Sequence, residues 1–171
     1  PEPLRDEQAG QKRFNLPTRN NIPLFTVISR LAYQKGLDVF AECLEGLLWK
    51  KDAQYVLIGS GDPHLEGRFN YLASKYPEHF AVYIGYAGEK LAHLVEAGGD
   101  FFVMPSRYEP CGLNQLYSMR YGNVPIVRNT GGLAEAVKNL DLDNISESTG
   151  FTFWDLSSES LYNTIRWATS I

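Results

Sequence analysis

The stretch LFTVISRLAYQKG, from Leu24 to Gly36, contains the transition on which the fold depends. It opens with an apolar, β-branched run, Leu24–Ser29, of the kind that forms a buried strand. A polar loop follows, and from Gly36 to Trp49 the apolar residues recur at helical spacing. A strand, a short loop and a helix in this order predict the first half of a βαβ unit.

The same alternation continues through the rest of the chain. Further strands are expected at Gln54–Gly59, Ala81–Gly85, Asp100–Met104, Val124–Val127 and Phe151–Phe153. Helices are expected at Gly36–Trp49, Leu65–Tyr76, Lys90–Ala97, Gly112–Tyr121, Leu133–Asn139 and Ser158–Ser170. Because the strands are mostly continuous apolar runs, both faces of the sheet should be covered by helices. We therefore predict an α/β fold with a doubly wound, mostly parallel six-stranded sheet of the Rossmann-like type.

The boundaries of this unit follow from composition. Residues 1–21 are polar and loosely patterned, and we interpret them as a linker into a domain formed by residues 22–171. The 171 residues, 44% of them hydrophobic, suffice for one sizeable core. Since the chain lacks an initiating Met, we expect it to be an excised domain.

Charge and cysteine content exclude several classes of protein. The net charge of -4 gives no general attraction to nucleic acid or to anionic membranes. No apolar run approaches the roughly 20 residues that span a bilayer. The two cysteines, Cys43 and Cys111, are too far apart in sequence to suggest a disulfide framework. We expect a soluble, cytoplasmic protein of a reducing compartment.

In a doubly wound sheet, ligands bind outside the carboxyl ends of the strands. The first such loop contains Arg30, Lys35 and a glycine at the helix start, a set that can hold a diphosphate. The same residues read equally well as solvated surface cations. The loop Gly59–Asp62 could form a phosphate turn, although a tight connection between strand and helix is the more common role for such glycines.

The loop after the fourth strand, PSRYEPCGLNQ at residues 105–115, combines a carboxylate and a thiol with polar groups ahead of a helix. Glu109 is the natural candidate to hold sugar hydroxyls, because carboxylates form charge-assisted hydrogen bonds. Alternatively, Glu109 is only a helix-start charge that the helix dipole favours. After the fifth strand, Gly131 and Gly132 either offer amide donors to a ligand or form a tight turn, and the glycines alone do not decide.

Four segments in this order and spacing resemble the C-terminal domain of bacterial glycogen synthases and plant starch synthases. They are RLAYQKG, GSGDPHLEG, PSRYEPCGLNQLYSMRYGNVPIV and NTGGLAEAV, and the resemblance covers Pro23–Ile171. It implies the C-terminal lobe of a two-domain, GT-B retaining glycosyltransferase whose N-terminal lobe is absent here. Such enzymes transfer glucose from a nucleotide sugar, generally ADP-glucose, to the nonreducing end of an α-1,4-glucan. UDP-glucose remains an alternative donor, and the isolated lobe should be inactive.

The resemblance also assigns roles to individual residues. It implies that Arg30 and Lys35 hold the diphosphate, that Glu109 binds glucose hydroxyls and that Tyr86 stacks on the base. The pocket would be lined by Cys111, Gly112 and Leu113, with Asn114 and Gln115 beside the ribose and phosphates. Two departures stand out: many relatives have Thr where this chain has Asn114, and Tyr117 replaces the second Glu of the wider superfamily.

Two other functions compete with this reading. One is a sucrose synthase-like or trehalose-forming transferase. The observations against it are the run Cys111–Leu113 together with Tyr117. The other is a noncatalytic nucleotide-sugar or glucan-binding module, which would not need Arg30, Lys35 and Glu109 together. No cofactor and no metal are expected. The Asp141–Asp143 pair lies in a polar loop, and we do not expect it to bind a metal. We expect surface roles for His64, His79 and His93, because their spacing is not that of metal ligands.

Overall fold

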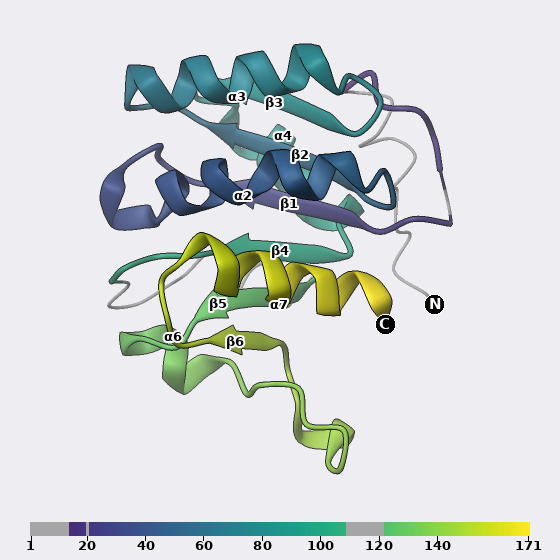
Figure 1. Cartoon of the computed structure of the whole chain (residues 1–171), viewed down its shortest axis with the longest axis vertical. Helices are drawn as coiled ribbons and strands as arrows, with labels where there is room; N and C mark the ends of the chain where they lie inside the picture. The colour runs from purple at the N-terminus through teal and green to yellow at the C-terminus, as the bar shows by residue number, and fades with distance from the viewer. Residues whose placement is uncertain (1–13, 20, 109–121) are drawn as a thin grey trace.

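The computed structural model describes residues 14–19, 21–108 and 122–171, without the side chains of residues 132–134. In it, six strands form one sheet in the order β3-β2-β1-β4-β5-β6, and every neighbouring pair is parallel. The strands are β1 (Leu24–Ile28), β2 (Gln54–Gly59), β3 (Phe80–Ile84), β4 (Phe101–Met104), β5 (Val124–Arg128) and β6 (Phe151–Phe153). Figure 1 shows these strands as one twisted layer.

Helices lie on both sides of this layer. They are α2 (Leu37–Trp49), α3 (Pro63–Lys75), α4 (Gly88–Gly98), α6 (Gly131–Ala136) and α7 (Ser158–Ser170), with 3-10 turns η1 (Tyr33–Lys35) and η2 (Ile145–Glu147). In Figure 1, α2, α3 and α7 lie in front of the sheet and α4 lies behind it. The predicted doubly wound α/β fold is therefore confirmed, with a sheet that is parallel throughout its six strands.

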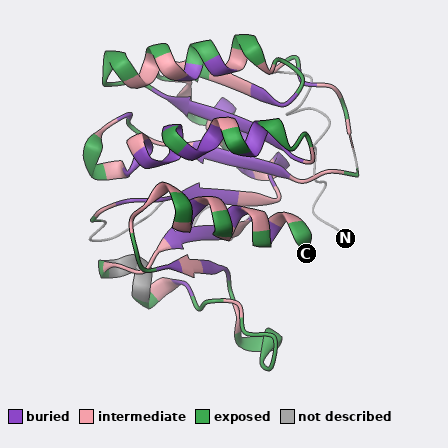
Figure 2. Ribbon diagram, in the orientation of Figure 1, coloured by how far each residue is buried: buried purple, intermediate pink, exposed green. Residues whose placement is uncertain are grey.

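Alternate residues of the strands supply the two halves of the core. Phe25 and Leu57, for example, pack in the large cluster that contains the buried residues of α2, α3 and α7. Their neighbours Leu24 and Val56 pack instead with Leu91 and Val95 of α4. The central strands are consequently buried along almost their whole length, as Figure 2 shows in purple. Burial on both faces explains why these strands read as continuous apolar runs in the sequence.

The ends of several elements differ from prediction by one to three residues. The third strand begins at Phe80 rather than Ala81, because Phe80 already pairs with Tyr55. The helix predicted at Leu133–Asn139 begins two residues earlier, at Gly131, and ends at Ala136. The predicted helix Gly112–Tyr121 lies outside the described residues. The polar stretch after Asp141 is an exposed loop, as predicted, and contains η2.

Part of the predicted linker packs on the domain. Leu16 is buried in the cluster on the α4 side of the sheet. The Gln54 side chain, at the start of β2, donates a hydrogen bond of 2.8 Å from Nε2 to the Pro17 carbonyl. These contacts attach residues 14–17 to the sheet, while the boundary at residue 21 stays a prediction.

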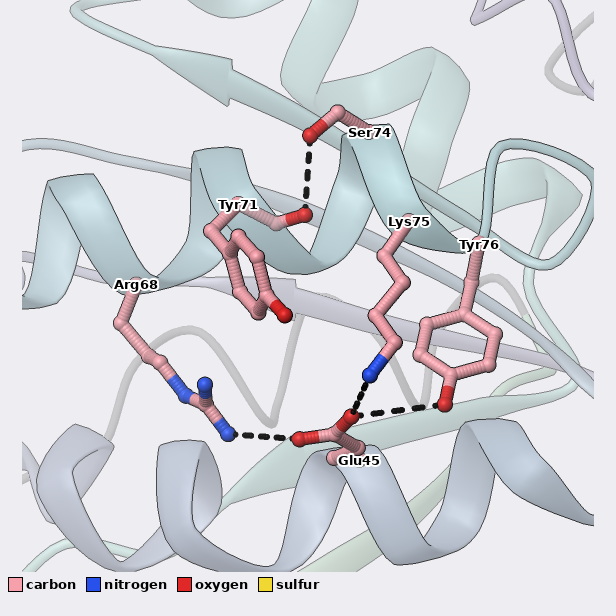
Figure 3. A network of polar contacts seen from close by, with 6 residues as sticks. All are labelled: Glu45, Arg68, Tyr71, Ser74, Lys75 and Tyr76. Atoms are coloured by element: carbon pink, nitrogen blue, oxygen red, sulfur yellow. Dashed lines mark hydrogen bonds and ion pairs between the residues drawn. The ribbon is translucent and has the colours of Figure 1, made fainter.

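A polar network on the surface joins α2 to α3. Glu45 of α2 accepts hydrogen bonds from Arg68 at 2.9 Å, Lys75 at 2.6 Å and Tyr76 at 3.4 Å (Figure 3). The bonds from Lys75 and Arg68 hold the pKa of the Glu45 carboxyl below its usual value. Because the side chains of these ion pairs are partly exposed to solvent, the pairs contribute little to stability.

No described helix combines the length and the apolar character needed to cross a membrane.

Candidate nucleotide-sugar site

The sheet order identifies where a ligand can enter. From β1 the chain moves outward to β2 and β3, and then returns to place β4 on the other side of β1. The connection after β1 therefore leads to β2 and the connection after β4 leads to β5, in opposite directions along the sheet. This topological switch point is the usual ligand-binding position in open α/β sheets.

A cavity of about 260 Å³ opens beside the switch point, and we call it the strand-end cavity. Its lining comes from the ends of β1, β2 and β3 and the start of α4, and includes Arg30, Ser60 and Tyr86. Tyr86 is 91% exposed, and its ring has no covering layer. Arg30 is also exposed and forms no ion pair within residues 14–19, 21–108 and 122–171. A guanidinium and an aromatic face on one cavity can together bind a phosphate group and a planar base.

Lys35 occupies a different position in the same loop. It ends η1, where its backbone N–H donates to the Ala32 carbonyl at 3.0 Å. It is half-buried and is not among the described residues that line the strand-end cavity. Gly36 follows with a φ of 70° and closes η1 through a 3.1 Å bond to the Tyr33 carbonyl. The structure thus places Arg30 and Lys35 in one loop, and Gly36, which follows Lys35, lies against the Pro105 carbonyl just after β4.

The loop Gly59–Asp62 has the geometry of a tight connection. The Gly61 N–H donates to Glu66 at 2.9 Å, and the Asp62 N–H donates to the Leu31 carbonyl at 2.8 Å. Asp62 also caps α3 by accepting a 2.8 Å bond from the His64 N–H. These amides are engaged within the protein, so the phosphate-turn reading of this loop gains no support.

The cap that Asp62 forms on α3 allows the stability of the domain to be tested separately from nucleotide binding. Asp62→Ala should lower the free energy of unfolding by about 1 kcal/mol, because the first turn of α3 loses its side-chain acceptor. It should leave the affinity for ADP within about twofold of the original, since no nucleotide contact is lost. Urea unfolding and calorimetry measure the two quantities. A large fall in ADP affinity would instead show that the loop Gly59–Asp62 is part of the binding site.

The remaining predicted residues are placed only in part. Glu109, Cys111, Gly112, Leu113, Asn114 and Gln115 lie outside the described residues. Gly131 is exposed and begins α6, and Gly132 follows it. Just before them, the Asn129 and Thr130 N–H groups donate to the Phe153 and Arg128 carbonyls, which leaves this turn closely tied to β5 and β6.

One histidine differs from prediction. His64 and His93 are exposed, as expected, but His79 is 5% exposed, and its Nδ1 lies 3.1 Å from the Ala53 carbonyl. Because a carbonyl only accepts, Nδ1 must carry the proton that joins the two groups.

Cys43 is a free, buried thiol, and its burial raises its pKa to about 12. Within the described ranges, no three His, Cys, Asp or Glu side chains gather as metal ligands would.

Sequence reasoning missed the contacts that join the strand-end loops. Arg107, in the loop after β4, pairs with Asp38 at the start of α2. Arg128, the last residue of β5, donates a 2.7 Å bond to the Arg107 carbonyl. Arg107 lies within the motif PSRYEP, but nothing in the sequence connects it with an aspartate 69 residues earlier.

The sequence matches the family described as glycosyl transferases group 1 over residues 8–170. The chain belongs to this family. Glycogen synthase 1 of Geobacter sulfurreducens is 48% identical over 157 residues, which make up 92% of this chain and 31% of that protein. The glycogen synthase of Thioalkalivibrio sulfidiphilus is 48% identical over 159 residues, 92% of this chain and 33% of that protein. The chain thus spans about a third of the length of these curated relatives.

Solved structures agree with this membership. The catalytic domain of starch synthase IV from Arabidopsis thaliana, bound to ADP and acarbose, matches with a TM-score of 0.87 and 32% identity. The match covers 98% of this chain and 35% of that one. The C-terminal domain of a group 1 glycosyl transferase from Francisella tularensis shares the fold, with a TM-score of 0.72, 19% identity, and coverage of 96% and 83%. The fold is that of the C-terminal lobe of a GT-B glycosyltransferase, which confirms the resemblance seen in the sequence.

Proposed function

We propose that this chain is the nucleotide-sugar-binding lobe of a glycogen or starch synthase, a retaining glucosyltransferase. The complete enzyme transfers glucose from ADP-glucose to the nonreducing end of an α-1,4-glucan, and the acceptor and the N-terminal lobe are this chain's partners. The observation that carries the proposal is the strand-end cavity, where Arg30 and Tyr86 face one space at the carboxyl edge of the sheet. Relatives named glycogen synthase, about half identical to this chain, support it.

The chemistry of transfer explains why cations are needed here. When the anomeric bond breaks, the sugar becomes oxocarbenium-like and the nucleoside diphosphate gains negative charge. Arg30 and Lys35, fixed in one loop, would stabilise that charge more in the transition state than in the ground state. Glu109 would hold the glucose hydroxyls, with Cys111, Gly112 and Leu113 beside them and Asn114 and Gln115 near the ribose. Gly131 and Gly132 would approach the phosphates closely.

A reducing compartment, such as the bacterial cytoplasm or the plastid stroma, is part of this proposal. The free thiol of Cys43 and the bacterial sources of the curated relatives support it. Other transferases remain less favoured. A sucrose-phosphate synthase from Thermosynechococcus elongatus shares the fold at a TM-score of 0.69, but its 22% identity is less than half that of the glycogen synthases.

The proposal predicts a preference for ADP over AMP. ADP should bind at least about tenfold more tightly, because Arg30 can form charge-assisted hydrogen bonds with the distal phosphate that AMP lacks. Arg30→Ala should bring the two affinities close together. Calorimetry with both nucleotides on both proteins measures this difference.

Arg68→Ala is a matched control. It also removes one positive charge, but Arg68 belongs to the network between α2 and α3 rather than to the strand-end cavity (Figure 3). Its ADP affinity should stay within about twofold of the original. If the unaltered chain binds ADP and AMP with equal affinity, Arg30 does not bind the distal phosphate as proposed.

A further inference from the structure

The strand-end cavity has a polar part and an apolar part. Arg30 and Ser60 contribute polar groups just after β1 and β2 end. Ile28 and Ile58, near the ends of the same two strands, contribute apolar side chains. Both isoleucines pack with the core cluster on the α4 side of the sheet. The apolar part of the cavity therefore lies on that side, between the strand ends and the start of α4.

Helix α4 leaves this apolar part open. It contributes Gly88 and Ala92 to the lining of the cavity. Because residues four apart lie on the same face of a helix, the two residues form one strip along α4, and this strip carries no side chain larger than a methyl group. A Cβ at Gly88 would meet no atom within 4 Å, apart from its chain neighbours and the backbone of its own helix.

The backbone explains the small residue at one of these positions but not at the other. Gly88 has a φ of 76°, a conformation that favours glycine whatever the surrounding space. Ala92 lies inside the regular part of α4, where a longer side chain such as leucine would suit the helix about as well. The size of the residue at position 92 therefore sets how much of the apolar part stays open.

The extent of the apolar part affects purine and pyrimidine bases differently. A purine has two fused rings and a pyrimidine has one, so a purine can cover more of the apolar lining and more of the Tyr86 ring. Both contacts favour binding, since hydrophobic stabilisation grows with the apolar area removed from water and bases stack on aromatic side chains. A longer side chain at position 92 would occupy space that the second ring needs.

We propose that Ala92 is a specificity-determining residue, which keeps the strand-end cavity wide enough for a purine base and so favours ADP over UDP. The proposal rests on the proposed function, because it requires the base to lie in this cavity against Tyr86. The phosphates of both nucleotides meet the same Arg30, so the choice between ADP-glucose and UDP-glucose as donor depends on the base.

The test compares the affinities of the 171-residue chain for ADP and UDP. Calorimetry gives the ratio of the two affinities for each variant, and the unaltered chain should bind ADP more tightly. Ala92→Leu adds three carbon atoms and should lower this ratio by about tenfold or more, because a single methylene in an apolar pocket already changes selection by about that factor. The affinity for UDP should fall much less than the affinity for ADP.

Ala97→Leu is the matched control. It is the same substitution on the same helix, and Ala97 is half-buried like Ala92 but is not among the described residues that line the strand-end cavity. The ratio should stay within about twofold of the original. Ala92→Val adds two carbon atoms and should lower the ratio less than Ala92→Leu, which keeps the test decisive if the leucine variant does not fold.

Tyr86→Ala separates failure of this inference from failure of the proposed function. If the chain binds neither nucleotide, or if Tyr86→Ala weakens neither, the base does not bind in this cavity, and the specificity proposal falls together with that part of the proposed function. If Tyr86→Ala weakens ADP binding but the variants of Ala92 leave the ratio unchanged, only the specificity proposal is overturned. It is also overturned if Ala92→Leu weakens ADP and UDP equally, as a general distortion of α4 would, or if the unaltered chain binds UDP as tightly as ADP.

Discussion

Replacing Gly36 with alanine should lower the free energy of unfolding by about 2 to 4 kcal/mol, from the combined cost of a left-handed conformation and a steric clash. Gly36 has a φ of 70° and sits between η1 and α2, where its carbonyl accepts the 3.2 Å hydrogen bond from the Phe40 N–H. A Cβ at this position would lie 1.9 Å from the Pro105 carbonyl oxygen. Because that oxygen belongs to the backbone, no side-chain rotation can relieve the clash, and the two loops must separate.

The same substitution should weaken ADP binding, because the displaced segment carries the residues proposed to hold the diphosphate. Urea unfolding gives the stability, and calorimetry at low urea gives the affinity of the molecules that still fold. The expected loss of stability is a large part of the total stability of a typical domain, roughly 5 to 15 kcal/mol.

Gly67→Ala provides the matched control. Gly67 lies in α3, and apart from its chain neighbours and the backbone of its own helix, a Cβ there would meet no atom within 4 Å. The substitution should therefore be neutral or should stabilise the helix by up to about 1 kcal/mol. If Gly36→Ala unfolds at the same urea concentration as Gly67→Ala, the loops after β1 and β4 are not held in the contact described.

The strands were predictable because burial on both faces leaves a plain signal in the sequence. Val56 and Leu57, for instance, point to opposite sides of the sheet, yet both are buried, so the run around them is apolar without alternation. The strand order was not predictable in this way. Crossovers that place β4 beside β1 depend on contacts between distant segments, and hydrophobic periodicity records only local geometry.

At the candidate site, too, the contacts between distant segments could not be predicted from the sequence. Arg30 and Tyr86 could be singled out because each directly follows a predicted strand, and the structure places both on one cavity. The partner of Arg107 could not be found, because Asp38 reads as an ordinary helix-start charge. His79 was misjudged for a similar reason: its polar side chain suggests the surface, while the nearby Ala53 carbonyl allows it to be buried.

The final prediction concerns the chain by itself. The 171-residue chain should fold and bind ADP or ADP-glucose, yet elongate no glucan. Its described residues build one sheet with one set of strand-end loops, and the chain spans about a third of the glycogen synthases that it matches. Glucosyl transfer requires the donor and the acceptor to be aligned and water to be excluded, which two-domain transferases achieve by closing one lobe on the other.

The strand-end cavity has no opposing surface within the described part of the chain: Tyr86 is 91% exposed, and Arg30 faces solvent. A sugar bound there would keep its anomeric carbon open to water, and no described group lies above it to place an acceptor hydroxyl. The experiment incubates the chain with labelled ADP-glucose and a maltooligosaccharide, follows chain lengthening, and measures ADP binding on the same sample. Full-length glycogen synthase 1 of Geobacter sulfurreducens, 48% identical to this chain over the matched residues, serves as the positive control. Elongation by the chain alone on the order of one glucose per second or faster would mean that this lobe carries a complete active site, against the expectation that catalysis requires both lobes.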